Sequence, residues 1–90
     1  MSAEYESIRV KTQQTLVDFL NSELALGNTF TRSALLAYDA GHTEHYEQAK
    51  KYAIRATESV RRFVGQVGDR KIRSEISDGV EDLERRISIL

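Results

Sequence analysis

The chain of 90 residues contains no cysteine, no proline and no tryptophan, and only five glycines. Without cysteine there is no disulfide framework, no thiolate zinc site and no cysteine nucleophile. The lack of disulfides also fits the cytoplasm, which we take as the expected location. Without proline, no residue forces a helix to stop. These absences favour a few long helices over a β-rich fold with many turns.

The charge of the chain is nearly balanced, and long apolar runs are absent. Thirteen Lys and Arg residues stand against 14 Asp and Glu residues, for a formal net charge of −1. No global field therefore draws the chain toward nucleic acid or lipid. The apolar runs fall far short of a membrane span, and the polar stretch MSAEYESIRVKTQQ gives no sign of a secretory signal. The composition, 40% apolar and 30% charged, is that of one small globular domain.

The segment from Tyr46 to Val67 carries the clearest helical pattern. Its apolar residues alternate at spacings of three and four, which is typical of a helix packed along one seam against an antiparallel partner. These residues are Tyr46, Ala49, Ala53, Ala56, Val60, Phe63 and Val67. A third helix is expected after Asp69, a good N-cap, with Gly65 ending the helix before it. Its apolar residues are Ile72, Ile76, Val80, Leu83, Ile87 and Leu90. Gly79 interrupts this pattern, which predicts close packing against another backbone at that point.

The first helical segment is the longest, and Gly27 raises a choice within it. One stripe continues across the glycine: Phe19, Glu23, Leu26, Phe30, Ala34 and Ala37. This favours one continuous helix, straight or bent. The alternative is a stop at Gly27 with a new N-cap at Asn28 or Thr29, which would give four helices.

The sequence therefore predicts one all-α domain over residues 1–90, an antiparallel three-helix bundle with a long first helix. The helices are expected at approximately residues 3–40, 43–65 and 69–90. The alternative fold has four helices with a break near Gly27. At 1.5 Å per residue, ~37 residues span ~55 Å, whereas the other helices span ~33–36 Å. The first helix must therefore overhang, bend or meet a second copy of the chain.

Self-association is expected because the first helix has apolar residues on more than one face. A helix in a three-helix bundle needs a single apolar stripe of about 100°, and Leu20 and Leu24 lie away from the line of Leu26 and Phe30. An exposed apolar patch usually marks an interface, and two-fold pairing is the commonest arrangement. We therefore predict a homodimer joined through the first helices. The expected interface residues are Leu16, Leu20, Leu24, Tyr5 and Ile8.

The stretch AYDAGHTEHYEQAKKYA at residues 37–53 raises the question of a metal site. His42 and His45 are three residues apart, and Asp39 lies three before His42. Because Gly41 suits the end of one helix and Thr43 the N-cap of the next, these side chains are expected on different elements. The segment HTEH also differs from the HExxH of zinc proteases and from the Glu-x-x-His of di-iron bundles. We therefore predict a helix corner, with no metal and no cofactor.

The same stretch resembles one helical hairpin of a tetratricopeptide repeat. The residues that carry the likeness are Tyr38, Gly41, Tyr46, Ala49, Tyr52 and Ala56. The turn is three residues longer than usual, and the chain has one hairpin where repeat arrays need several. Together with the segment DRKIRSEISDGVEDLERRI, the hairpin is more similar to a microtubule-interacting and transport domain. That resemblance covers about fifty residues and implies a three-helix adaptor whose grooves bind partner helices. A looser likeness to small bacterial helical proteins implies no activity.

Five cations surround the loop expected after the second helix: Arg61, Arg62, Arg70, Lys71 and Arg73. Cations at the start of a helix oppose its dipole, at about 0.3–1 kcal/mol each. One interpretation is a site for an anion or an acidic partner, built from these cations and the free amides of the helix start. The other is a solvated loop compensated by Asp69 and Glu75. The segment lacks the series of aromatic residues interleaved with cations that is typical of single-strand binders.

Little in the sequence suggests catalysis. Glu23 is a lone carboxylate on an apolar stripe, expected to lie at its edge or to pair with Arg55 or Arg86. Phosphate loops, nucleophile elbows and dinucleotide fingerprints are absent. We therefore predict a non-enzymatic helical protein–protein interaction module that associates with itself and has no membrane partner. The alternative is a small binder of an acidic ligand or nucleic acid through residues 61–73.

Overall fold

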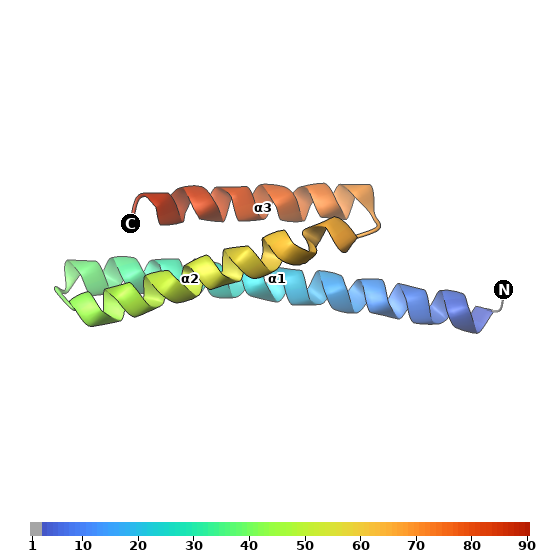
Figure 1. The fold of residues 1–90 in the computed structure, drawn as a ribbon, viewed down its shortest axis with the longest axis horizontal. Helices are drawn as coiled ribbons and strands as arrows, with labels where there is room; N and C mark the ends of the chain where they lie inside the picture. Colours follow the sequence, from blue (N-terminus) through green and yellow to red (C-terminus); the bar gives the residue numbers. More distant parts are fainter. Residues whose placement is uncertain (1–2) are drawn as a thin grey trace.

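The computed structural model describes the backbone of residues 3–90 and the side chains from residue 12 onward. It contains three α-helices, α1 (Ala3–Asp39), α2 (Thr43–Phe63) and α3 (Arg70–Ser88), with a short 3₁₀ turn at Val64–Gln66 between the last two. Consecutive helices run antiparallel, and α3 lies along the α1–α2 hairpin (Figure 1). No strand occurs among residues 3–90. The predicted all-α three-helix bundle with a long first helix is confirmed.

Helix α1 continues through Gly27, so the four-helix alternative is wrong. The two residues considered as a new N-cap are part of the helix instead. Asn28 Nδ2 donates to the Leu24 carbonyl at 3.0 Å, and Thr29 Oγ1 donates to the Ala25 carbonyl at 3.0 Å. Both bonds reach back four residues, as in the interior of a helix.

Gly27 is explained by packing. A Cβ built at this position would collide with the side chain of Leu83 on α3 and come within 3.3 Å of the Ala56 Cβ on α2. The glycine therefore forms a hole into which Leu83 inserts where the three helices meet. Gly79 plays a smaller part of the same kind, since its Cβ would lie 3.2 Å from Leu24 Cδ1. Its neighbour is a side chain, so the expected contact with another backbone is wrong.

The core follows the seam predicted on α2. Small residues let α1 and α2 approach closely: Ala34, Ala37, Ala49, Ala53 and Ala56 are all buried. Larger side chains fill the space under α3: Leu20, Val60, Val67, Ile76, Val80 and Leu83. Each such side chain contributes about 1.5–3 kcal/mol on burial. These layers hold α3 against one side of the hairpin.

The core face of α1 differs from the predicted stripe. Leu20 is fully buried, and Leu16 and Leu24 are half-buried against the same core. These three leucines therefore already have partners within one chain, which corrects their assignment to an interface between two chains. Tyr5 and Ile8, the other predicted interface residues, lie outside the described side chains. Phe19 and Leu26, placed on the core stripe by the sequence, are 42% and 47% exposed.

The corner between α1 and α2 is a glycine-terminated helix end. Gly41 has φ +75°, a left-handed conformation that favours glycine. The His42 amide donates to the Ala37 carbonyl at 2.8 Å and the Gly41 amide to the Tyr38 carbonyl at 3.1 Å, the pattern of a Schellman motif. The predicted C′ glycine is confirmed. The residue before α2 is His42, without a side-chain cap, so the predicted cap at Thr43 is wrong.

The turn between α2 and α3 was predicted correctly at one end. Asp69 Oδ1 accepts a hydrogen bond from the Ile72 amide at 2.9 Å, which confirms the predicted N-cap. Gly65 lies inside the 3₁₀ turn with a negative φ, so its predicted role as a left-handed helix end is wrong. The chain leaves the helical region only at Val67, where φ is −70° and ψ is 119°.

The molecule is a rod of 59 × 19 × 15 Å because α1 is much longer than the helices beside it. At one end, α1 continues past the α2–α3 turn (Figure 1). At the other end, the α1–α2 corner projects beyond the C-terminal end of α3 (Figure 1). Of the three outcomes expected from the mismatch in length, the overhang is the one observed within a single chain.

Candidate interaction surface

Helix α3 covers one face of the α1–α2 hairpin and leaves the opposite face without a helix. On α1, Leu24 and Asn28 contact α3, whereas Phe19 and Leu26 lie roughly half a turn around the helix from them. We call the uncovered side the open face. It is formed by Phe19, Leu26 and Phe30 of α1 and by Tyr52 and Phe63 of α2. A fourth helix laid here would complete a four-helix arrangement.

Two aromatic pairs cross the hairpin on the open face and hold α1 to α2. The rings of Phe19 and Phe63 meet edge to face with centroids 6.1 Å apart, and those of Phe30 and Tyr52 are 5.2 Å apart. Such pairs contribute about 0.5–1.5 kcal/mol beyond their buried area. A depression of about 460 Å³ adjoins the first pair. The open face is therefore both apolar and fixed in shape.

A second stripe, without any charged residue, runs along the outer side of α1 next to the open face. Its positions alternate at spacings of three and four, as in the seam of a coiled coil. They are Thr12, Thr15, Phe19, Ser22, Leu26, Thr29, Ser33 and Leu36. All are exposed except Ser33, which is half-buried, and Leu36 is 65% exposed. We call this set the outer stripe. In the sequence, Ile8 and Tyr5 continue the same spacing.

The outer stripe is the feature that sequence reasoning missed. The signal was present, because a helix of a chain with 30% charged residues normally carries charges on its solvent side. The predicted stripe through Phe19 and Leu26 was instead assigned to the core. Ala34 and Ala37, at the end of that stripe, are indeed buried. The helix therefore presents one apolar side to α2 and α3 and a second uncharged side to solvent.

Two of the five cations predicted around the α2–α3 turn form contacts within the chain. Arg61 forms a two-pronged interaction with Glu84 of α3, at 2.5 and 3.2 Å, and Arg73 Nη1 donates to the Val67 carbonyl at 2.9 Å. The hydrogen bond from Arg61 lowers the pKa of Glu84 below its ordinary value. Three of the five predicted cations, Arg62, Arg70 and Lys71, remain exposed without such a bond.

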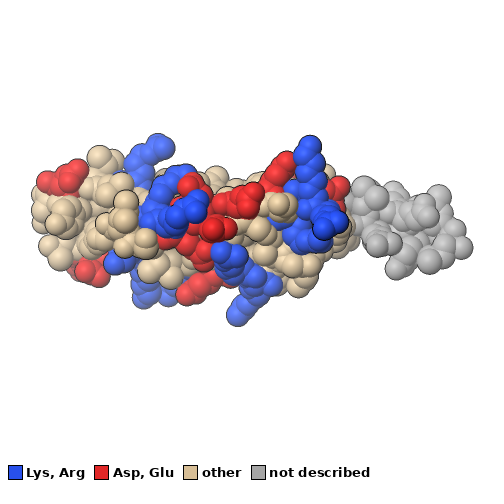
Figure 2. All heavy atoms as spheres, turned by 90° about the horizontal axis from the view of Figure 1, so that it is seen from above, with Lys and Arg blue, Asp and Glu red and all other residues tan. Residues whose placement is uncertain are grey.

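The charges of α3 are also compensated locally. Arg86 donates to Asp82 of its own helix and to the Asn28 side chain of α1, the latter at 2.7 Å, so it ties the two helices together. The hydrogen bond from Arg86 lowers the pKa of Asp82. On the face of the molecule drawn in Figure 2, Lys and Arg side chains are interspersed with Asp and Glu, and they form no continuous basic surface there.

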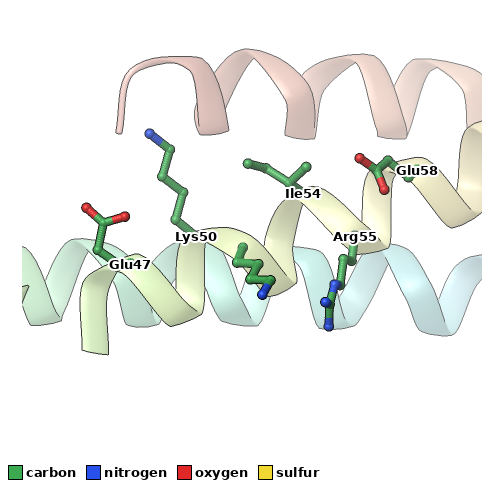
Figure 3. Close-up of a pocket in the computed structure, with 6 residues that line it drawn as sticks. Glu47, Lys50, Ile54, Arg55 and Glu58 are labelled. Carbon is green, nitrogen blue, oxygen red and sulfur yellow. The ribbon is translucent and has the colours of Figure 1, made fainter. Parts of the chain in front are cut away.

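The remaining candidates are the two histidines of the α1–α2 corner and a depression on α2. His42 and His45 are both exposed, and no group of three or more His, Cys, Asp or Glu residues able to hold a metal occurs among the described residues. A depression of about 380 Å³ on α2 is lined by side chains of both signs (Figure 3). Lys50 points toward α3, and Arg55 points away from it (Figure 3).

Glu23 lies half-buried between Phe19 and Leu26, at the edge of the open face. It forms no ion pair with Arg55 or Arg86, the partners expected from the sequence. Arg55 instead places its guanidinium 5.8 Å from the centre of the Tyr52 ring, and Arg86 binds Asp82. Glu23 therefore belongs to the edge of the open face, as one of the two sequence interpretations had it.

Comparison with known protein families, with curated proteins and with solved structures finds no match for the chain. The likeness to tetratricopeptide repeats and to microtubule-interacting and transport domains therefore stays a prediction. In the described part of the chain, no helix is long and apolar enough to cross a membrane.

Proposed function

We propose that this chain is a non-enzymatic helical protein–protein interaction module that forms a homodimer through the open face and the outer stripe of α1. One observation carries the proposal. Three large apolar side chains, Phe19, Leu26 and Leu36, are 42%, 47% and 65% exposed on one uncharged side of a long helix. Contiguous exposed apolar surface on a folded protein usually marks an interaction site.

The shape of the surface favours a helix as the occupant. The outer stripe has the three-and-four spacing of a coiled-coil seam, and helices recognise such seams by inserting side chains between those of the partner. The aromatic pairs on the open face are fixed by contacts across the hairpin, so little order is lost when a partner binds.

Binding, in preference to catalysis, is supported by the chemistry of the exposed residues. Four charged residues of α3, Glu81, Asp82, Arg85 and Arg86, are paired with one another, and the two histidines lie on the α1–α2 corner away from the open face. The open face presents rings, aliphatic groups and hydroxyls. Such groups bury area and form hydrogen bonds, but they supply no activated nucleophile and no general base near neutral pH.

A matched pair of leucines on α1 tests the proposal. Leu26 belongs to the outer stripe, and Leu35 lies on the side of α1 that faces α3; they are 47% and 48% exposed. Leucine and lysine have similar helix propensities, so both changes to lysine should preserve the fold. We expect Leu26→Lys to abolish the dimer in light scattering and Leu35→Lys to leave it intact. Equal effects, or no effect of either, would contradict the proposed surface.

A further inference from the structure

We infer that the second copy binds antiparallel, in one register, with the outer stripes of the two α1 helices facing each other and the two-fold axis passing next to Ala25. This inference rests on the proposed self-association and adds its geometry. It comes from two independent patterns along α1, the sizes of the side chains in the outer stripe and the charges beside it.

The first pattern is the alternation of large and small side chains along the outer stripe. When two copies are laid antiparallel and centred between Ser22 and Leu26, Leu26 of each copy meets Ser22 of the other. In the same register, Phe19 meets Thr29 and Leu36 meets Thr12. Each large apolar side chain therefore faces a small hydroxyl residue, which lets the helices approach closely without voids.

The second pattern is a row of residues spaced by seven along one edge of the outer stripe: Asp18, Ala25, Arg32 and Asp39. In the same antiparallel register, Asp18 of each copy lies next to Arg32 of the other. Both are exposed, and neither forms an ion pair with another described residue. A charged residue next to the two-fold axis would lie beside the same charge of the second copy. The residue at that position is the uncharged Ala25, so this repulsion does not arise. Lys11 extends the row in the sequence, at the position opposite Asp39.

The charges also exclude the neighbouring registers. A shift by seven residues in one direction brings Asp18 next to Asp39, and a shift in the other direction brings Arg32 next to Lys11. Like charges placed opposite each other are destabilising, by amounts similar to what opposite charges contribute. In a parallel pairing, this row lies on opposite edges of the seam in the two copies, which sets Asp18 of one copy next to Glu23 of the other, also a repulsive contact. Only the antiparallel register centred at Ala25 pairs opposite charges along the whole row.

The lengths of the helices agree with this arrangement. The part of α1 that continues past the α2–α3 turn would lie along the α1–α2 corner of the second copy, which itself projects beyond α3 (Figure 1). The overhang and the projecting corner therefore cover each other in the dimer.

On the other edge of the outer stripe, the register brings Glu23 next to the same residue of the second copy. We therefore expect Glu23→Gln to tighten the dimer about two- to tenfold, because it removes a like-charge contact.

Charge reversal tests the register. In the antiparallel dimer, Asp18→Arg or Arg32→Asp turns two attractive contacts into two repulsive ones, and we expect the dissociation constant to rise about tenfold or more. The double variant with both changes restores the pairs and should dimerise like the unmodified chain. Mixing the two single variants should give a heterodimer tighter than either homodimer. Asp78→Arg, an exposed reversal on α3, is the matched control and should have no effect.

The results separate the inference from the proposed function. An unmodified chain that is monomeric at all concentrations would overturn both. A dimer whose affinity is unchanged by Asp18→Arg and Arg32→Asp would overturn the register alone. Circular dichroism on each variant shows whether the fold is kept. If a single variant loses its fold, cross-linking of introduced cysteines decides the orientation instead.

Cross-linking tests the orientation without changing a charge. The chain has no cysteine, so one introduced thiol per copy reports on one position. With a short bismaleimide, Ala25→Cys should give a covalent dimer in high yield, because the two thiols lie beside the axis. Leu36→Cys should give no covalent dimer, because the two Leu36 positions lie at opposite ends of the antiparallel pair. A parallel dimer would cross-link at Leu36→Cys, where the two copies of that position face each other. Absence of cross-linking at Ala25→Cys would overturn the inference.

Discussion

Replacing Gly27 by alanine sets two effects of opposite sign against each other. In an exposed helix, alanine is more favourable than glycine by about 0.8–1.0 kcal/mol. At Gly27, the new Cβ would collide with the fully buried Leu83 and lie 3.3 Å from the Ala56 Cβ. Overpacking of a core typically costs about 1–3 kcal/mol. We expect packing to prevail, with a net loss of about 1 kcal/mol, equivalent to a fall in Tm of about 4–8 °C.

The collision predicts that the sign of the effect reverses when its partner is shortened. In a Leu83→Ala background, the methyl of Gly27→Ala no longer meets the Leu83 side chain and keeps only the 3.3 Å contact with the Ala56 Cβ. The alanine should then stabilise the chain, by at most its helix propensity of about 1 kcal/mol. Gly65→Ala is the control, because nothing lies within 4 Å of a Cβ there and its φ is negative. This change should leave the free energy of unfolding unchanged or raise it. Urea unfolding of the four variants measures each term.

The reasoning about Gly27 would be refuted by a simple result. If Gly27→Ala stabilises the unmodified chain as much as it stabilises the Leu83→Ala chain, then Leu83 does not occupy the hole. The same outcome would weaken the assignment of α3 to one side of the hairpin, since Leu83 is a residue through which α3 contacts both α1 and α2.

Three further changes test the core, the corner and the ion pair by unfolding. Leu20→Ala should lower the free energy of unfolding by about 2–5 kcal/mol, because the side chain is fully buried. A loss below about 1 kcal/mol would contradict the burial of Leu20 in the core. Gly41→Ala should destabilise by about 1 kcal/mol, because φ is +75°, whereas a neutral result would contradict the Schellman end. Glu84→Gln should cost no more than about 1 kcal/mol at pH 7, since the side chains of Arg61 and Glu84 are 47% and 40% exposed. Because the folded-state pKa of Glu84 is lowered, that cost should be present above the unfolded pKa and vanish as the pH falls through the folded pKa; a cost that persists in acid would exclude the pair.

The sequence was sufficient where one helix has one apolar side. The three-and-four spacing from Tyr46 to Val67 identified the α2 seam, and Asp69 marked the start of α3, because caps and seams depend on residues close in sequence. Gly41 was placed correctly for the same reason, since a left-handed helix end is a local feature.

The sequence was not sufficient for α1, because this helix has uncharged residues on two sides. Local spacing cannot show which side meets α2 and α3, and the stripe through Phe19 and Leu26 was assigned to the core in place of the stripe through Leu20 and Gly27. Gly27 in particular raised the alternative of a break in the helix, whereas its role depends on Leu83, 56 residues later in the chain. Contacts that are distant in sequence decide the face, and they alone assign Leu20 to the core and the outer stripe to solvent.

Thr31 illustrates the same limit for a polar residue. It is buried at 4% exposure, which its residue type does not predict. Its hydroxyl donates to the Gly27 carbonyl at 2.8 Å, so the polar group is satisfied within the helix and its burial costs little. Sequence patterns that count only apolar residues pass over such positions.

The mass of the chain in solution tests the central claim most directly. Light scattering on the purified protein, from low to high micromolar concentration, should give twice the chain mass of 10.3 kDa at the high end and fall toward the single mass on dilution. The same series with Leu26→Lys should give the single mass throughout, at unchanged helix content. A mass of 10.3 kDa for the unmodified chain at every concentration would contradict the proposed homodimer and leave the outer stripe of α1 without the partner assigned to it.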